Sequence, residues 1–402
     1  MTMGSRRSRF SRLSLLRGYR GWSLSLLVVL ASASFSQSSF AQSGGTAPAS
    51  VLPARLSDQE FWKLSTDLSE PPGTFRSENL LSNETGYQMV IPSLLKGDRQ
   101  NKVYMGVGPE QNYTYIAALK PKMVIIIDIR RGNLLEHLLY KSIFELSANR
   151  NEFMARLFGK KLDTKLDTNS TADALANAYW GVEGDSATYA RHKAAVRDLL
   201  VTTHKFPLTP EDVEHLNWIY DQFYYFGLPI TYNSSGGMGG GRGGGSMPTY
   251  ADLMMSLDGQ LPTPTNRGYL ASEANWRVVK DLHAKNLIVP VMGDFGGPKA
   301  IRATAAWLKE RGATVAAFYA SNVEQYLWQD NKAYAYYESV AELPTDSSSV
   351  IIRSGGGGRG GFGGGGGGMR GPNYMCPIKD LVAANKAGRV NMYNDVFSYC
   401  TY

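Results

Sequence analysis

Two glycines and an acid lie at a spacing that suits a nucleotide site. Gly106 and Gly108 follow a short β-rich segment, and Asp128 ends an apolar run about 20 residues later. In a dinucleotide site the glycines let the backbone approach the ligand, and the acid accepts the ribose hydroxyls. The third glycine of the G-x-G-x-x-G pattern is absent, because Gln111 stands there, and Glu110 adds a negative charge. A cofactor without a pyrophosphate at this turn therefore fits the residues better.

A second glycine-rich turn, at residues 293–299, opens a predicted helix at the end of a strand. Free amide groups at the start of a helix attract anions, so Gly296, Gly297 and Lys299 are candidates for binding a phosphate or a carboxylate. The alternative is a tight strand-to-helix turn that Asp294 caps. The pattern alone leaves both interpretations open.

Polar side chains at two other strand ends have the same ambiguity. Arg130 and Arg131 could bind a phosphate or a carboxylate, or they could be solvated. Asn322 and Glu324 follow a later predicted strand and could face the same cleft. Alternatively, Ser321 and Asn322 could cap the next helix.

Metal-binding and nucleophile motifs are missing from the sequence. The five histidines show neither H-E-x-x-H nor another paired spacing, so we expect no metal site. The sequence has no G-x-S-x-G motif and no context for a cysteine nucleophile, so nucleophilic hydrolysis is not indicated. The histidines are His137, His192, His204, His215 and His283.

Alternating apolar strands and helices predict an α/β fold. Residues 123–127 form a continuous apolar run, which suits a parallel strand buried on both faces. Helical patterns between the strands imply right-handed crossovers. We therefore expect a Rossmann-like, mostly parallel sheet with helices on both faces, together with an N-terminal helical arm and a helical insertion. The strands are expected at 103–107, 123–127, 287–292 and 314–319, with a further one at 350–353.

The motif around Gly106, Gly108 and Asp128 resembles that of the class I S-adenosylmethionine-dependent methyltransferase superfamily. The resemblance implies that the glycine loop holds the methionine part of the cofactor and that Asp128 holds the ribose. It also implies that Asp294, after the next strand, lies on the adenine side.

The resemblance covers residues 103–147 and 273–330, under half of the chain. The chain departs from the family in three respects: the first strand lacks its usual acid, the glycine loop is incomplete, and a long helical insertion precedes the third strand. Residues 103–146 and 289–326 also resemble an uncharacterised group of exported bacterial proteins. That second likeness implies no activity.

The first 41 residues have the composition of a secretory signal. They contain six arginines and no acid, an apolar stretch at 24–35, and a small-x-small sequence that ends at Ala41. The apolar stretch is shorter than the roughly 20 residues of a membrane span, so we expect cleavage rather than anchoring. The pair Arg6-Arg7 loosely resembles a twin-arginine signal, which leaves the export route open. The chain is therefore predicted to be exported, to the periplasm or beyond.

Cleavage of this signal would change the charge and the redox setting of the chain. Removing the six arginines lowers the formal net charge from +7 to +1, which does not suit a general nucleic-acid binder. Cys376 and Cys400 are the only cysteines, and an oxidising compartment favours a disulfide between them. Free or metal-binding thiols are the alternative.

The sequence divides into several segments. Two glycine tracts are expected to be disordered surface loops, because they cannot bury enough apolar surface to offset their conformational entropy. An aromatic run at 218–226 could line a pocket or pack in a helical core. The predicted segments are a signal peptide (1–41), a linker (42–56), an arm with the first half of the Rossmann-like domain (57–148), a helical insertion (149–272) with a glycine-rich loop (236–246), the second half of the domain (273–354), a glycine-rich loop (355–371) and a C-terminal tail (372–402).

Three functions are compatible with these residues. The first is an exported protein that binds a small nucleoside-like or anionic ligand, with catalysis left open. The second is an active methyltransferase that uses S-adenosylmethionine, with Glu110 or Glu324 as the base; export argues against it, because that cofactor is made in the cytoplasm. The third is a non-enzymatic scaffold that binds a protein partner. The predicted ligand cleft consists of Gly106, Gly108, Asp128, Asp294 and Asn322.

Overall fold

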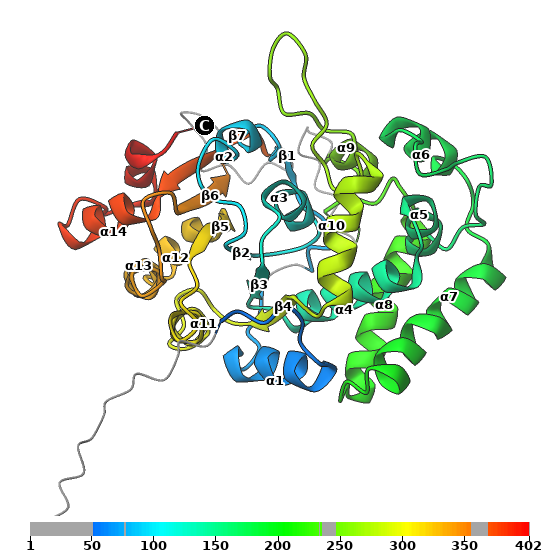
Figure 1. Cartoon of the computed structure of the whole chain (residues 1–402), viewed down its shortest axis with the longest axis horizontal. Coiled ribbons are helices and arrows are strands. Elements are labelled where there is room, and N and C mark those ends of the chain that lie inside the picture. The colour runs from blue at the N-terminus through cyan, green and yellow to red at the C-terminus, as the bar shows by residue number, and fades with distance from the viewer. Residues whose placement is uncertain (1–50, 76–77, 233, 235–246, 355–368, 402) are drawn as a thin grey trace, which may run out of the picture. The chain divides into compact units, whose positions relative to one another are not determined.

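The computed structural model describes residues 51–75, 78–232, 234, 247–354 and 369–401 of the chain (Figure 1). These residues belong to one unit that spans residues 48–402. The predicted signal peptide, most of the predicted linker and both glycine tracts lie outside the described residues. Within the described ranges, no helix is long and apolar enough to cross a membrane.

A seven-stranded sheet of order β1-β7-β6-β5-β2-β3-β4 forms the centre of this unit. Strands β2 to β6 are parallel, whereas β7 is antiparallel to β6 and parallel to β1. Counted along the chain from β2, the parallel strands have the order 3-2-1-4-5 of a Rossmann sheet, which confirms the predicted fold class. The strands are β1 (Glu84–Gly86), β2 (Val103–Gly106), β3 (Met123–Asp128), β4 (Ile288–Met292), β5 (Val315–Ser321), β6 (Val350–Ser354) and β7 (Met369–Pro377).

Continuous apolar runs explain why the parallel strands occupy the interior. Every residue of β3 is buried, and β2 pairs with it from Val103 opposite Met123 to Gly106 opposite Ile126. The five predicted strands agree with β2 to β6, but β1 and β7 were not predicted. Strand β7 begins inside the range 355–371 that was expected to be a loop. Glycine and proline at its start weaken the strand pattern, and the ladder with β6 supplies the backbone partners instead.

Helices surround the sheet, and their packing separates two groups. Helices α3, α4 and α10 contact one another near β2 to β4, while α1 packs on β4 and α11. The helices are α1 (Asp58–Leu68), α2 (Ile91–Leu94), α3 (Asn112–Leu119), α4 (Arg131–Leu146), α5 (Arg150–Leu157), α6 (Ala172–Tyr179), α7 (Ser186–Asp198), α8 (Pro210–Phe226), α9 (Tyr250–Met254), α10 (Glu273–Ala284), α11 (Ala300–Lys309), α12 (Val323–Gln329), α13 (Ala333–Ala341) and α14 (Ile378–Lys386), with a π-helix at Leu199–Thr203 and a 3-10 helix at Tyr393–Tyr399.

The insertion between the two halves of the sheet is helical, as predicted. Helices α5 to α8 lie together at one side of the sheet (Figure 1). The aromatic run of α8 packs mainly in this helical group, since Tyr220 and Phe223 are fully buried. Tyr225 points outward and is 78% exposed, so the run does not line a common pocket.

The C-terminal segment is tied back to the sheet by a disulfide. Cys376 in β7 and Cys400 are bonded, with their Cα atoms 4.1 Å apart, which confirms the predicted pair. Met375 and Thr401 also pair through their backbones, since each amide donates to the other residue's carbonyl. The tail is therefore bound to the antiparallel strand β7.

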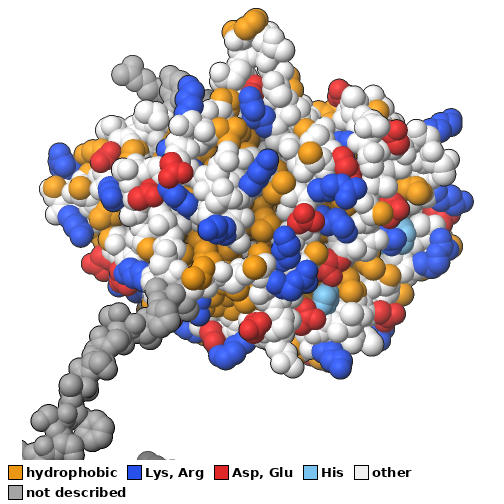
Figure 2. Space-filling view, in the orientation of Figure 1, with side chains coloured by type: hydrophobic (Ala, Val, Ile, Leu, Met, Phe, Trp, Pro, Cys, Tyr) orange, Lys and Arg blue, Asp and Glu red, His pale blue; other side chains and the backbone are white. Residues whose placement is uncertain are grey.

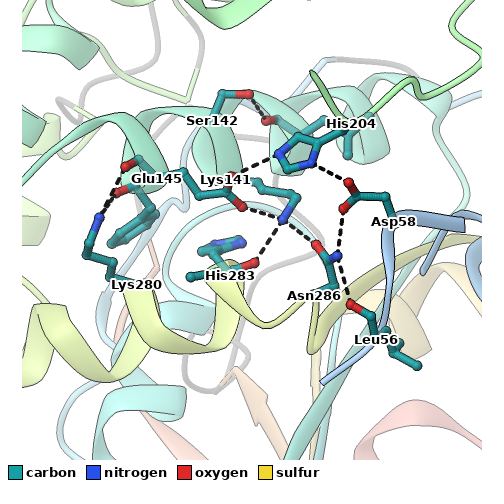
Figure 3. Close-up of polar contacts among 12 residues, drawn as sticks. Leu56, Asp58, Lys141, Ser142, Glu145, His204, Lys280, His283 and Asn286 are labelled. Carbon is teal, nitrogen blue, oxygen red and sulfur yellow. Dashed lines mark hydrogen bonds and ion pairs between the residues drawn. The ribbon is translucent and has the colours of Figure 1, made fainter. Parts of the chain in front are cut away.

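A polar cluster fixes the N-terminal arm at the amino-terminal edge of the sheet (Figure 3). We call it the arm cluster, and it consists of Asp58, Lys141, Glu145, His204 and Asn286. Lys141 Nζ donates to Glu145 Oε1 and to Asn286 Oδ1, both at 2.5 Å. The His204 ring lies between two carboxylates, with Nδ1 3.0 Å from Asp58 and Nε2 2.9 Å from Glu145. The cluster thereby joins α1, α4, the π-helix and the turn before β4.

We predict that the arm cluster makes stability depend on pH through His204. Burial opposes a charge on this ring, but hydrogen bonds to Glu145 and Asp58 outweigh it and raise the pKa of His204 above its ordinary 6.5. A raised pKa in the folded state stabilises the fold below pH 6.5, and this stabilisation is lost as the pH rises through the raised value. His204→Ala should therefore lower the free energy of unfolding by about 1.5 to 3 kcal/mol below pH 6.5.

Urea unfolding of the wild type and of the His204→Ala variant between pH 5.5 and 9 measures this dependence. The difference between the two proteins should shrink as the pH rises above 6.5. A difference that stayed constant over this range would mean that the ring acts by packing alone. Burial lowers the pKa of Lys141, the other cation of the cluster, and Glu145 opposes this effect. Lys141→Met serves as the comparison, because it removes a charge from the cluster and keeps the ring of His204.

Candidate functional site

The loop after β2 folds around one side chain at the switch point of the sheet. Asn112 Nδ2 donates to the carbonyls of Val107, Gly108 and Pro109 at 2.9, 3.2 and 2.7 Å. Its Oδ1 accepts a hydrogen bond from the Tyr104 hydroxyl at 2.9 Å. The centre of the predicted glycine loop is therefore filled by the chain itself.

This arrangement explains both glycines of the loop. A Cβ on Gly106 would lie 2.0 Å from Asn112 Oδ1, so no side chain fits there. Gly108 has a φ of +76°, a conformation that other residues rarely adopt. The conformation of the turn requires both glycines. The described residues leave no space for a ligand in front of them.

Asp128, the predicted ribose acid, is held by the neighbouring Arg130. Asp128 Oδ1 accepts from the Arg130 amide at 2.9 Å and from Nε at 3.0 Å, and Oδ2 accepts from Nη2 at 3.1 Å. Both side chains are buried, and Arg130 also pairs with Glu78 at 3.3 Å. Burial opposes the charge of Arg130, but Asp128 outweighs it and raises the pKa of the guanidinium. A ribose at Asp128 would have to displace this arginine.

Asp294 caps its own turn, which is the alternative that the sequence left open. Its Oδ1 accepts from the amide of Gly296 at 2.9 Å, and its Oδ2 pairs with Lys332 at 2.6 Å. The Asp294 carboxylate is thus bound by the turn and by a lysine. Among the described residues it makes no hydrogen bond or ion pair with Asp128. The predicted adenine side therefore has a structural role here.

The predicted anion site at the start of α11 already holds an anion from the chain. Glu70 Oε1 accepts from the amides of Lys299 and Ala300, both at 2.7 Å. Lys299 Nζ donates to the carbonyl of Ser69 at 2.7 Å. A Cβ on Gly297 would lie 2.3 Å from the Glu70 carboxylate, so the glycine makes room for it. The N-terminal arm therefore occupies this turn.

Two further predicted residues form ion pairs with other parts of the chain. Arg131 pairs with Asp212 of α8 at 2.7 Å. Glu324 lies fully buried 2.8 Å from Arg353 Nη1 and accepts from the Tyr337 hydroxyl at 2.8 Å. Burial raises the pKa of Glu324, while Arg353 opposes this effect. Glu324 therefore belongs to the core between α12 and β6.

Asn322 stands at the N-cap position of α12 but makes no side-chain cap hydrogen bond. Its Oδ1 lies 3.5 Å from the Ser321 hydroxyl, and Ser321 in turn donates to Glu84. The structure thus places Asn322 at the carboxyl end of β5 without bringing it to Asp128 or to Asp294. Among the described residues, no hydrogen bond or ion pair joins any two of the five residues of the predicted cleft, and the carboxylates of Asp128 and Asp294 are engaged by other parts of the chain.

A buried network that the sequence analysis missed lies at the ends of β1, β5 and β7. Glu84 Oε1 accepts from the Tyr319 hydroxyl at 2.9 Å, and its Oε2 accepts from Asn373 at 2.8 Å. Gln111 Nε2 donates to the Tyr319 oxygen at 3.0 Å. Burial raises the pKa of Glu84, although these hydrogen bonds oppose the rise. The segment that carries Glu84 reads as a turn in the sequence, so nothing marked it.

One small pocket adjoins this network, and we call it the Glu110 pocket. It lies between the loop after β2, helix α3, helix α9 and residues 268–270. Its empty volume is about 270 Å³, which includes the opening to solvent. At its base the side chains leave room for about one water molecule. Its lining consists of Tyr87, Glu110, Gln111, Thr114, Tyr250, Leu253, Met254, Gly268, Tyr269 and Leu270.

Glu110 is the predicted site residue that lines this pocket. Its side chain is buried, and burial raises its pKa to about 8. Glu110 Oε2 and Gln111 Oε1 have no hydrogen-bond partner among the described residues. Buried acceptors without donors cost about 1 to 3 kcal/mol each, so a native fold rarely keeps them without a use. The space beside them is large enough for one polar group, either a water or an N–H group of a ligand, to satisfy these oxygens.

Other chemistry has little support in the described part of the chain. No group of three or more His, Cys, Asp or Glu side chains there is placed to hold a metal ion. His137 is buried with Nε2 2.9 Å from the Gly108 carbonyl and Nδ1 2.9 Å from the Tyr113 hydroxyl. Burial lowers the pKa of His137 to about 4, so this ring is neutral and supports the loop after β2.

A known family model covers most of the residues that form this fold. A family model described as a domain of unknown function (DUF7790) matches residues 80–225 and 257–363, well over half of the chain. The chain therefore belongs to that family. The unmatched stretch between the two segments contains the first glycine tract. No curated protein matches the sequence.

Proposed function

Starting from membership of a family without an assigned activity, we propose that the chain binds a small nucleoside-like molecule at the carboxyl ends of the strands, with an amino group of the ligand in place of the single water for which the Glu110 pocket has room. The observation that carries the proposal is the pair of buried, unpartnered oxygens, Glu110 Oε2 and Gln111 Oε1. An exocyclic amino group of a nucleobase offers two N–H donors to such a pair.

The position of the pocket in the sheet supports the same proposal. Glu110 and Gln111 follow β2, and Gln111 contacts Tyr319 of β5. Strands β2 and β5 are the neighbours at which the order of the parallel strands reverses. Open α/β sheets bind ligands at the carboxyl ends of the strands beside this point.

A purely anionic ligand is disfavoured by the charges at this edge. The cations predicted to hold an anion are engaged by the chain's own carboxylates: Arg130 by Asp128, and Arg131 by Asp212. The amides at the start of α11 are engaged by Glu70. No lysine, arginine or histidine is among the residues that line the Glu110 pocket.

A methyltransferase that uses S-adenosylmethionine is the second candidate function. The strand order 3-2-1-4-5, with a glycine turn after its first strand, favours it. The pairing of Asp128 with Arg130 disfavours it, because the carboxylate that would bind the ribose is already engaged.

Export is part of the first proposal, and the disulfide between Cys376 and Cys400 supports it because such bonds persist in oxidising compartments.

Binding of nucleosides to the purified protein tests the proposed function. Adenosine, S-adenosylhomocysteine and S-adenosylmethionine are compared by calorimetry and by thermal shift. We expect adenosine to bind and Glu110→Gln to weaken it about tenfold, the effect of losing one hydrogen bond in a buried site. Asp294→Asn is the matched control, since Asp294 belongs to the predicted cleft but does not line the pocket, and it should leave the affinity within about twofold. Equal weakening by both variants, or no binding of any nucleoside, would contradict the proposal.

A further inference from the structure

We infer that the groove between α13 and α14 binds an extended acidic peptide of a protein partner, with one large apolar side chain in the groove and a carboxylate on either side of it. The two helices pack against each other on the side of the sheet opposite the helical insertion (Figure 1). The groove shares no lining residue with the Glu110 pocket, so this inference is independent of the proposed function.

The groove is apolar at its base and has room for one large side chain. Val340 and Ile378 are each 1% exposed and line its base. Its volume is about 240 Å³. A cavity of about 150 Å³ holds a benzene ring, whereas pockets for whole small-molecule ligands usually exceed about 300 Å³. The volume therefore suits a single apolar side chain of a larger partner. The lining consists of Val340, Ala341, Thr345, Ile378, Lys379, Val382, Ala383 and Lys386.

The α14 side of the groove is a stripe of the helix that faces solvent. Apart from Ile378 at the base, α14 contributes positions 379, 382, 383 and 386, and this i, i+3, i+4, i+7 spacing places them on one face of the helix. Lys379, Ala383 and Lys386 in this stripe are exposed. The stripe is therefore accessible to a partner. The side chains that α14 buries in the core are Ile378, Leu381 and Ala384.

Two lysines make the groove selective for an acidic partner. Lys379 and Lys386 stand at opposite ends of the stripe, about 10.5 Å apart along the helix axis. Among the residues that the structure describes, neither lysine has an ion-pair partner. The carboxylates of α13 do not neutralise them, because Glu338 and Glu342 both pair with Arg302 of α11. Two carboxylates of a partner would complement these positive charges.

An extended peptide matches both the spacing of the lysines and the single apolar space between them. In an extended chain, residues i, i+2 and i+4 face the same side, and each residue adds about 3.3 Å. Acidic residues at i and i+4 are thus about 13 Å apart, a separation that flexible lysine side chains can reach. The residue at i+2 then points into the groove. The groove therefore fits the pattern acid-x-apolar-x-acid.

Charge separates this occupant from others. The first 41 residues of the chain contain six arginines and no acid, so the lysines of the groove would repel that segment. An anionic membrane presents charge without a fixed spacing and offers no single side chain for the groove. An acidic peptide supplies both features.

Fluorescence anisotropy with a labelled peptide of sequence Ser-Glu-Ser-Phe-Ser-Glu-Ser tests the inference on the purified protein. The peptide should bind with a Kd below about 1 mM. Replacing its phenylalanine with serine should weaken binding at least about tenfold, because the apolar burial is lost. Replacing both glutamates with glutamine should weaken binding about fivefold, and added salt should weaken the glutamate peptide more than the glutamine peptide.

Variants of the chain locate the binding site. Ala383→Glu places a carboxylate at an exposed position of the lining and should weaken binding of the glutamate peptide at least about tenfold. The double variant Lys379→Gln with Lys386→Gln should weaken it about fivefold. Lys309→Gln is the matched control, because Lys309 is an exposed lysine that does not line the groove, and it should leave the affinity within about 1.5-fold. Circular dichroism checks that each variant is folded.

Several outcomes would overturn the inference. Equal affinity for the glutamate and glutamine peptides would show that the lysines do not select the partner, and equal effects of Ala383→Glu and Lys309→Gln would place the peptide elsewhere. Absence of peptide binding at millimolar concentration would have the same consequence. Cosedimentation with vesicles that contain phosphatidylglycerol, or self-association in sedimentation velocity, would assign the groove to a membrane or to a second copy if Ala383→Glu abolished it while no peptide bound.

Discussion

Asp128→Ala should lower the free energy of unfolding by about 3 to 5 kcal/mol. Arg130 is 5% exposed, and its three contacts with Asp128 supply most of the compensation for its buried charge. Removing the carboxylate leaves a guanidinium in the interior with the pair to Glu78 at 3.3 Å and a hydrogen bond to the Asn79 carbonyl at 3.5 Å. An uncompensated buried charge of this kind is among the most destabilising changes in a protein core.

The double variant Asp128→Ala with Arg130→Met isolates the cause. If the loss comes from the unpaired arginine, the double variant should recover at least half of it, because both charges are then absent. Urea unfolding followed by circular dichroism measures all four members of the cycle. Recovery below about 0.5 kcal/mol would show that Asp128 acts by another route, such as its bond to the backbone amide at residue 130.

This prediction also changes how ligand binding to Asp128 variants is interpreted. A carboxylate that bound a nucleotide at the end of β3 could be replaced without loss of stability, because its partner would be the ligand. Here the partner is part of the chain, so loss of binding in Asp128→Ala would reflect loss of structure. The Glu110 variants do not have this difficulty, because Glu110 Oε2 has no described partner to leave behind.

The strands were predictable from the sequence because burial on both faces demands a continuous apolar run. The five residues from Met123 to Ile127 satisfy that demand locally, and the structure has them fully buried. The capping box of Ser57 and Glu60 is also a local pattern, and α1 begins directly after Ser57. Strand β7 lacks such a local pattern, and its position depends on the ladder that it forms with β6.

The candidate site was less predictable, because its partners are distant in sequence. Glu70 lies 229 residues from Lys299, and no spacing rule connects an acid at the end of α1 with the amides of α11. A glycine-rich turn beside a helix start looks the same whether the anion comes from a ligand or from the chain. The sequence left an anion site and a turn capped by Asp294 both open; in the structure Asp294 caps the turn, and the free amides bind the Glu70 carboxylate.

Glu110 shows what the sequence can predict about a site residue and what it cannot. Its type and its place after the glycine turn marked it as a residue that could do chemistry. Burial raises its pKa, and Tyr250 and Tyr269, which line the same pocket, come from the end of the insertion. Tertiary contacts of that kind decide whether a carboxyl is a solvated surface group or part of a site, and the sequence pattern does not contain them.

The loop after β2 allows a second large effect to be predicted, from Gly106→Ala. The added Cβ would lie 2.0 Å from Asn112 Oδ1 and 3.1 Å from a ring carbon of Tyr104. Asn112 cannot yield without breaking its three hydrogen bonds to loop carbonyls, and it is fully buried. We expect the free energy of unfolding to fall by about 3 kcal/mol, the upper range for overpacking. Thermal and urea unfolding both measure this loss.

Gly181→Ala is the control that separates crowding from backbone strain. Gly181 has a φ of +68° and no atom within 4 Å of a placed Cβ, so its substitution adds strain without a clash. It should cost about 1 kcal/mol, whereas Gly106 is not in the left-handed region and should suffer from the clash alone. If the two substitutions cost the same, Asn112 is able to move aside. The loop would then be adaptable, and its closure around Asn112 would be one of several conformations from which a ligand could select.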